Sequence, residues 1–123
     1  DVQQMQHLQE LGLDTSNASA EYYRMSKKMD WFLVFGCRSK EELLDTEESI
    51  PAYTLQDVLD ALPLGITYER YRYLLVIEKY YIRYESDDYH IAVRFGGNNL
   101  IDAAYELLCW CIENKFVETN KNE

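Results

Sequence analysis

The sequence contains no apolar run of the roughly 18 residues that a transmembrane helix needs, so we expect no membrane span. It also lacks a basic segment followed by an apolar one at its start, so no secretory signal is predicted. Cysteine is scarce, with three residues in a chain of 123. A chain of this length can build its own core, and an odd number of cysteines does not suggest a disulfide framework. Together these absences predict a reduced, cytoplasmic protein.

Residues suited to catalysis or to metal binding are also few. The two histidines, His7 and His90, lie outside any recognisable Ser/His/Asp or Cys/His motif, and the glycine-rich phosphate-binding patterns are missing. Cys109 and Cys111 are two positions apart on a predicted helix, where side chains point about 200° away from each other and cannot bind one ion together. The sequence therefore predicts that the protein is not an enzyme and holds no metal or cofactor. A small hydrolase stays open, because any two of the 22 acidic residues could converge in space.

Basic residues are absent from positions 41–60, which carry seven acids in a chain of net charge −10. A net negative charge repels phosphate, so binding to nucleic acid is disfavoured. We interpret the acidic segment as a solubilising surface. Two alternatives stay open for it, namely docking to a basic partner and mimicry of nucleic-acid charge.

The composition, with 47% hydrophobic residues and 11 tyrosines, predicts a single α+β domain over residues 1–123. An apolar stripe over residues 2–11 predicts a helix that ends at Gly12 in a Schellman motif. Residues 18–29 fit either a helix or a hairpin. We favour a hairpin, because the segment 31–35 has the composition of a strand and needs a neighbour.

The middle of the chain is predicted to pass from a loop into a second short helix. A solvated loop is expected up to Ser49. The helix begins at the N-cap Thr54, whose capping box uses Asp57, and it ends at Pro63 because proline cannot continue a helix interior. The pair at positions 64–65 is predicted to turn the chain.

Three strand-like segments rich in tyrosine follow, over residues 71–77, 80–85 and 89–95. The second and third alternate apolar and polar residues, which is typical of strands with one face on a core and one in water. The connections between them are short enough to permit only hairpins. We therefore predict an α+β fold in which an antiparallel sheet of four to five strands packs the C-terminal helix, 99–114, on one face. Two shorter helices complete the core.

The C-terminal helix is apolar over more than half of its circumference. Its only compact polar ridge consists of Asp102, Glu106 and Glu113. A helix that lies on one sheet needs an apolar stripe of about 100° or somewhat more. The excess requires a further cover, for which two sources stay open: one of the shorter helices, or a second copy or a foreign partner.

The wet face of the predicted sheet combines tyrosine with arginine. Tyr81 and Arg83 come from one strand, and His90 and Arg94 from the next, with Arg72 as a further neighbour. Such side chains pack on one another across strands, and both residue types are favoured at protein interfaces. Stacking on single-stranded bases is opposed by the acidic charge. Together with two aromatic residues of the C-terminal helix, the candidate interaction surface consists of Tyr81, Arg83, His90, Arg94, Tyr105 and Trp110.

Three segments carry a resemblance, residues 7–16 (HLQELGLDTS), 50–59 (IPAYTLQDVL) and 99–114 (NLIDAAYELLCWCIEN). They resemble small proteins encoded in phages, prophages and other mobile elements of gut bacteria. The segments fall at the start, middle and end, so the resemblance spans most of the chain. It implies a mobile-element origin and an accessory role, and it transfers no catalytic residue because no activity is assigned to such proteins.

The sequence thus predicts a non-enzymatic accessory interaction protein of a mobile element. Its expected partner is a second copy of itself or a host or phage protein, with no role for nucleic acid or a membrane. The alternative is an acidic inhibitor that mimics nucleic acid and acts on a host DNA-binding protein.

Overall fold

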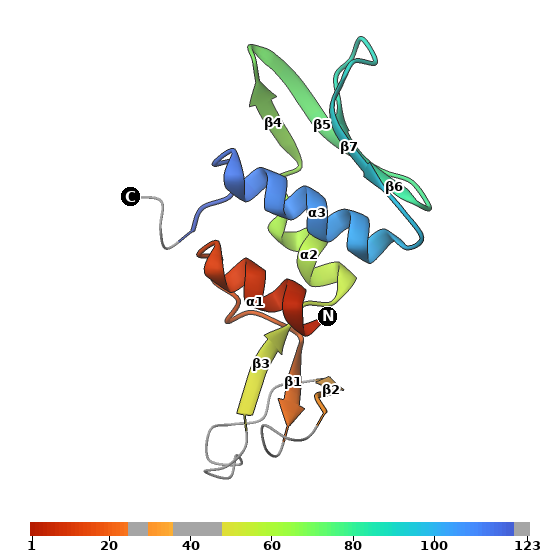
Figure 1. Cartoon of the computed structure of the whole chain (residues 1–123). Helices are drawn as coiled ribbons and strands as arrows, with labels where there is room; N and C mark the ends of the chain where they lie inside the picture. Colours follow the sequence, from red (N-terminus) through yellow and green to blue (C-terminus); the bar gives the residue numbers. More distant parts are fainter. Residues whose placement is uncertain (25–29, 36–47, 120–123) are drawn as a thin grey trace.

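The computed structural model describes residues 1–24, 30–35 and 48–119 (Figure 1). None of the helices in these residues is long and apolar enough to cross a membrane. The described residues form, in chain order, α1 (Val2–Glu10), β1 (Ala20–Arg24), β2 (Phe32–Phe35), β3 (Glu48–Ala52), α2 (Leu55–Ala61), β4 (Gly65–Tyr68), β5 (Tyr71–Ile77), β6 (Tyr81–Glu85), β7 (Ile91–Gly96) and α3 (Leu100–Glu113).

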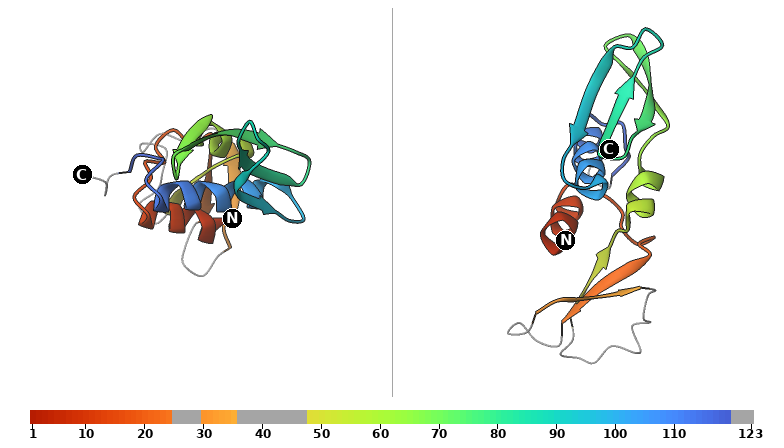
Figure 2. Two further views of the ribbon diagram at one scale, coloured as in Figure 1. Left: turned by 90° about the horizontal axis from the view of Figure 1, so that it is seen from above. Right: turned by 90° about the vertical axis from the view of Figure 1, so that its right-hand side faces the viewer.

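Strands β4 to β7 form an antiparallel meander, in which each strand pairs with the next one along the chain. Helix α3 lies on one face of the meander, where it contacts β6 and β7, and α2 packs against α3 (Figure 2). The predicted α+β fold is confirmed, with an antiparallel sheet of four strands, the C-terminal helix on one face and two shorter helices.

A second antiparallel sheet, with the order β2-β1-β3, lies at the other end of the molecule (Figure 1). Its β1–β2 pair confirms the predicted hairpin, although the turn at 25–29 lies outside the described residues. The predicted loop up to Ser49 is wrong in its last two residues, because β3 begins at Glu48 and pairs with β1. Residues 36–47 of that loop also lie outside the described part of the chain. Pro51 is tolerated in β3 because β3 is an edge strand.

The end of α1 has the predicted Schellman geometry. The Leu13 N–H donates to the Leu8 carbonyl at 3.1 Å, and the Gly12 N–H donates to the Gln9 carbonyl at 3.0 Å. Gly12 has a φ of 95°, a left-handed conformation that glycine adopts without a steric penalty. Leu8 and Leu13 are both buried, so the cap fixes the direction in which the chain leaves α1.

The start of α2 is tied to the start of β1 by one carboxylate. Asp57 and Thr54 form the predicted capping box, in which the Asp57 N–H donates to Thr54 Oγ1 and the Thr54 N–H donates to Asp57 Oδ2. The same carboxylate accepts from Ser19, from its hydroxyl at 2.6 Å and from its N–H at 2.9 Å. A residue predicted only as a cap therefore also joins α2 to the segment that enters β1.

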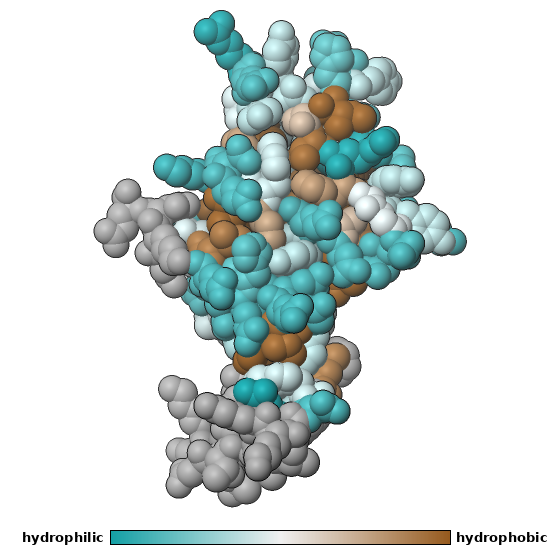
Figure 3. Space-filling model, viewed as in Figure 1, coloured by the Kyte–Doolittle hydropathy of each residue, from teal (hydrophilic) through white to brown (hydrophobic). Residues whose placement is uncertain are grey.

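The apolar arc of α3 is covered mainly by the chain itself, through the meander, α2 and α1. Its polar ridge is exposed as predicted, and Ile101 is its one strongly apolar residue with substantial exposure, at 37%. Seen from the side of α1 and α3, hydrophobic residues form only separate patches among hydrophilic ones (Figure 3). The fully or nearly fully buried residues of α3 are Ala103, Ala104, Leu107, Leu108, Cys111 and Ile112.

The β4–β5 hairpin turns through two residues in the left-handed region. Tyr68 pairs with Tyr71, and between them Glu69 has a φ of 50° and Arg70 a φ of 79°. Two positive φ values in a two-residue turn are typical of type I′, for which Asn-Gly is the favoured sequence. The turn predicted at positions 64–65 is wrong at Gly65, which already pairs with Leu74 and begins β4, whereas Leu64 lies in a bend.

Replacing Glu69 by Asn and Arg70 by Gly is expected to raise the free energy of unfolding by about 1 kcal/mol. Glycine adopts the left-handed conformation without the steric cost of a Cβ atom, and asparagine adopts it at a lower cost than glutamate. Urea unfolding followed by circular dichroism measures the change. The matched control, Glu69→Ala with Arg70→Ala, removes the same charges but retains both Cβ atoms. Equal stabilisation of the control would show that charge, and not backbone conformation, is the cause.

Candidate functional site

The face of the meander opposite α3 carries the predicted surface residues, and we call it the outer face. Ile82 and Tyr84 of β6 are fully buried on the α3 side, so their neighbours Tyr81 and Arg83 point the other way. No described helix or strand covers that side (Figure 2). Besides Gly65 and Gly96, the strand register assigns to the outer face Thr67, Arg72, Leu74, Val76, Tyr81, Arg83, Glu85, Ile91 and Arg94.

A β-bulge in β7 changes the composition of the outer face. Tyr84 pairs with Val93, but Glu85 pairs with Ile91, so Ala92 is the extra residue. Ala92 packs against the core, and Ile91 is 46% exposed on the outer face. The predicted alternation, which placed Ile91 inside and Ala92 outside, is therefore wrong at these two positions. A bulge puts two residues opposite one, and period two does not survive it.

His90 is not on the outer face with Arg94, because β7 begins only at Ile91. It belongs to the β6–β7 turn, where its N–H donates to Ser86 Oγ at 3.1 Å and its carbonyl accepts from the Ser86 N–H at 2.8 Å. The prediction that His90 lies on the strand in line with Arg94 is wrong for this reason.

The charges of the outer face are partly neutralised in place. The Arg83 guanidinium contacts Glu78 and Glu85, each at 3.2 Å, and its side chain is only 15% exposed. Arg94, directly opposite Arg83, lies over the Tyr81 ring with its Cζ 5.3 Å from the ring centroid. Two arginines that face each other would repel, so the two glutamates and the tyrosine ring make their proximity tolerable.

Glycine on β7 gives Tyr81 its position. Tyr81 pairs with Gly96, and a Cβ atom on Gly96 would lie 2.3 Å from the Tyr81 ring. One edge of the ring therefore occupies the space that a side chain at position 96 would fill, and any such side chain would displace it. On the β4 side, a Cβ on Gly65 would lie 2.7 Å from the Arg72 guanidinium, so Arg72 likewise extends over a glycine. The outer face is thus smooth at both of these places.

The two predicted residues of α3 lie elsewhere. The Tyr105 ring is 6.4 Å from the His7 ring of α1, and both Tyr105 and Trp110 are partly buried. Trp110 is surrounded by Tyr68 at 5.4 Å, Phe116 at 5.6 Å and Tyr84 at 6.4 Å between ring centroids. The structure therefore brings together Tyr81, Arg83 and Arg94, and it separates Tyr105, Trp110 and His90 from them.

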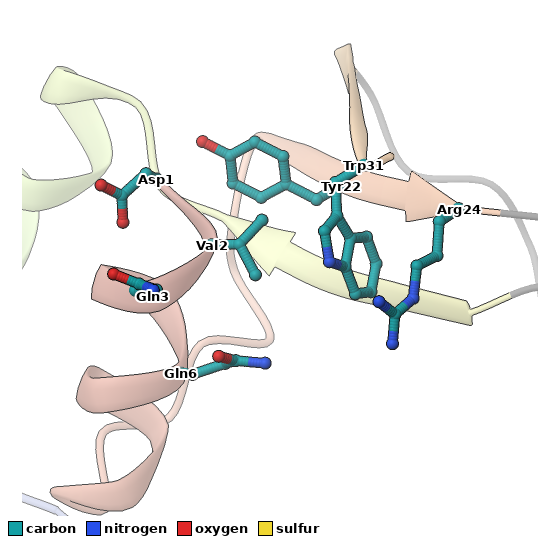
Figure 4. Close-up of a pocket in the computed structure, with 7 residues that line it drawn as sticks. All are labelled: Asp1, Val2, Gln3, Gln6, Tyr22, Arg24 and Trp31. Atoms are coloured by element: carbon teal, nitrogen blue, oxygen red, sulfur yellow. The ribbon is translucent and has the colours of Figure 1, made fainter. Parts of the chain in front are cut away.

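An open groove of about 670 Å³ lies between α1 and the three-stranded β2-β1-β3 sheet, the small sheet of the molecule (Figure 4). Tyr22 points across it toward the start of α1, and the Arg24 guanidinium stacks on the Trp31 ring with its Cζ 4.4 Å from the centroid. The sequence carries no signal for this groove, because its two walls come from separate segments that no motif connects. The groove offers aromatic surface and amide groups, and its lining residues are Asp1, Val2, Gln3, Gln6, Tyr22, Arg24 and Trp31.

The thiols of α3 belong to the packing of the helix. Cys111 is buried with its Sγ 3.7 Å from the Tyr84 hydroxyl oxygen, and Tyr84 in turn donates to the Pro63 carbonyl at 2.7 Å. Burial raises the pKa of Cys111 to about 11 and also raises the pKa of half-buried Cys109. Both groups are therefore mainly protonated near neutral pH, and a protonated thiol is a poor nucleophile and metal ligand.

Within residues 1–24, 30–35 and 48–119, no group of three or more His, Cys, Asp or Glu side chains is placed to hold a metal ion. The outer face instead presents aliphatic, aromatic and arginine side chains, which are suited to contact with another surface. Comparisons with protein-family models, with curated proteins and with solved structures find no match to this chain.

Proposed function

We propose that the chain is a non-enzymatic interaction protein of the cytoplasm, an accessory protein of a mobile element, and that the outer face is its contact surface. The observation that carries the proposal is an apolar and arginine-containing sheet face with no described element over it. Leu74 is 50% exposed and Ile91 46% exposed on this face. A sheet normally turns alternating polar residues to water, so exposed aliphatic residues there favour a role in binding.

The arrangement of the face also fits an interface. Aliphatic Leu74 and Ile91 lie on either side of Glu85, and Val76 pairs with Arg83 in the next row of the sheet. Tyrosine and arginine, which the same face carries, are enriched where proteins bind each other. Tyr81 rests on Gly96, and Arg83 is held by two glutamates. Side chains that are already fixed lose little conformational freedom on binding, which lowers the entropic cost of association.

The acidic mimic remains the second candidate, and one observation reduces its basis. Of the seven acids in residues 41–60, Asp57 is buried and joins α2 to β1, while Asp60 is exposed. Asp57 is therefore unavailable to a partner. A contact driven by the remaining acids would weaken steeply with added salt.

Capture from a bacterial lysate on immobilised protein tests the proposal with a matched pair of variants. Ile91→Glu is expected to abolish capture, since it places a charge in the proposed contact. Leu33→Glu is expected to leave capture unchanged, because Leu33 has the same 46% exposure as Ile91 but lies on the small sheet. Capture that survives Ile91→Glu would contradict the outer face as the contact. Capture that survives the variant and is lost at high salt would favour the acidic mimic.

A further inference from the structure

We infer that the partner of the outer face is a second copy of this chain, with two meanders packed face to face. The inference rests on the proposed function and names its partner. Two stacked sheets lie about 10 Å apart and bury the side chains between them. Three features of the described residues point to a second copy: the charge distribution, the distribution of exposed apolar side chains, and the state of Arg83.

The charge of the molecule is divided unevenly between its parts. Residues 65–96, which make up the meander, carry five acidic and five basic side chains. The other described residues carry twelve acidic and two basic side chains. Two copies therefore repel each other through most of their surface. The meander is the part through which they can approach without a net electrostatic cost.

Exposed apolar side chains are concentrated in the same part of the chain. Ten large hydrophobic side chains are exposed among the described residues, and eight of them lie within residues 64–91. Three of the eight, Leu74, Tyr81 and Ile91, are on the outer face. The outer face itself carries three arginines and one glutamate, so it is free of the excess acid that marks the remainder of the chain. Its apolar side chains can therefore be buried against a second copy with less repulsion than any part of the strongly acidic remainder.

Arg83 at the centre of the face does not prevent this burial. Its guanidinium already contacts Glu78 and Glu85 within the same chain, and its side chain is 15% exposed before any partner binds. Most of the desolvation free energy of this guanidinium is therefore already included in the folding of the monomer, and dimerisation adds little to it. The neighbouring Arg94 lies on the Tyr81 ring, so it can keep its charged end at the rim.

Sedimentation velocity over a range from micromolar to submillimolar protein tests the inference. We expect a concentration-dependent dimer, and we expect added sodium chloride to strengthen it because salt screens the repulsion between the two acidic bodies. A chain that stays monomeric over the whole range overturns the inference. A dimer that weakens as salt is added also overturns it, because that response belongs to a contact between opposite charges.

Variants locate the contact. Ile91→Glu and Leu74→Glu are each expected to weaken the dimer by at least about tenfold, equivalent to about 1.4 kcal/mol. Leu33→Glu is the control with equal exposure, and it is expected to leave the dimer unchanged. If Leu33→Glu weakens the dimer as much as Ile91→Glu and Leu74→Glu do, the assignment of the contact to the outer face is overturned. Circular dichroism checks the fold, and Leu74→Glu keeps the test decisive if Ile91→Glu fails to fold.

The two proposals fail separately. A strictly monomeric protein whose lysate capture still depends on Ile91 loses the second copy but keeps its role as an interaction protein. If no dimer forms and no capture depends on Ile91, both proposals are overturned.

Discussion

Replacing Leu107 by alanine is expected to lower the free energy of unfolding by about 3 kcal/mol, within the 2–5 kcal/mol typical of buried Leu→Ala changes. Leu107 has no exposed surface and lies in the main core with Tyr84 and Val58. Truncation leaves a cavity that the meander and α2 fill only in part, and each lost methylene forfeits burial and dispersion contacts. Urea unfolding followed by far-ultraviolet circular dichroism gives the value.

The control for Leu107 is Ile101→Ala on the same helix. Ile101 is 37% exposed, and its truncation is expected to cost less than about 1.5 kcal/mol because part of its surface is already in water. The comparison tests whether the chain itself covers the apolar arc of α3. Equal costs for the two variants would contradict the burial pattern, as would a Leu107→Ala protein as stable as the wild type.

Replacing Asp57 by asparagine is expected to lower the free energy of unfolding by about 2–3 kcal/mol near neutral pH. Asp57 is 8% exposed, and its carboxylate accepts hydrogen bonds from both Ser19 and Thr54. Bonds to a charged acceptor contribute more than neutral ones, and asparagine retains only one acceptor oxygen. Asp60→Asn is the matched control, since Asp60 is exposed on the same helix, and it is expected to change stability by less than about 0.5 kcal/mol.

The pH dependence gives a second test of Asp57. Burial raises its pKa, but the hydrogen bonds from Ser19 and Thr54 outweigh burial and hold the pKa below the usual value. The folded state therefore favours the charged carboxylate. Its contribution is fully present above a pH of about 4, the pKa of an unfolded aspartate, and is lost as pH falls through the lower folded pKa. The stability difference between wild type and Asp57→Asn should shrink over that range, and a constant difference would contradict this origin.

Local chemistry made much of the fold predictable from the sequence. The Schellman end at Gly12 and the capping box at Thr54 depend on a few adjacent residues, and both occur as predicted. The β5–β6–β7 hairpins follow from short connections between strand-like segments. Strands β3 and β4 were not predicted, because proline is unfavourable in a strand and because β4 is only four residues long, with three strand-forming residues after Gly65. Both form through pairing with a neighbour.

The outer face was only half predictable. Tyr81, Arg83 and Arg94 follow from alternation and are correctly placed together. Ile91 could not be found in this way, since one extra residue in β7 reverses the faces beyond it. Leu74 and Val76 lie in a run of apolar residues, 73–77, where no alternation shows which side chains face the core. The faces of that run are set by pairing with β6, a tertiary contact that no local pattern contains.

The division of charge between the meander and the remainder of the molecule makes the monomer a large electric dipole. An electric field would orient such a molecule as well as attract its net charge. On a positively charged support, the acidic part would face the support and the neutral meander at the far end of the molecule would face the solvent. Adsorption would therefore produce a layer of molecules with one common orientation, each displaying its least charged end.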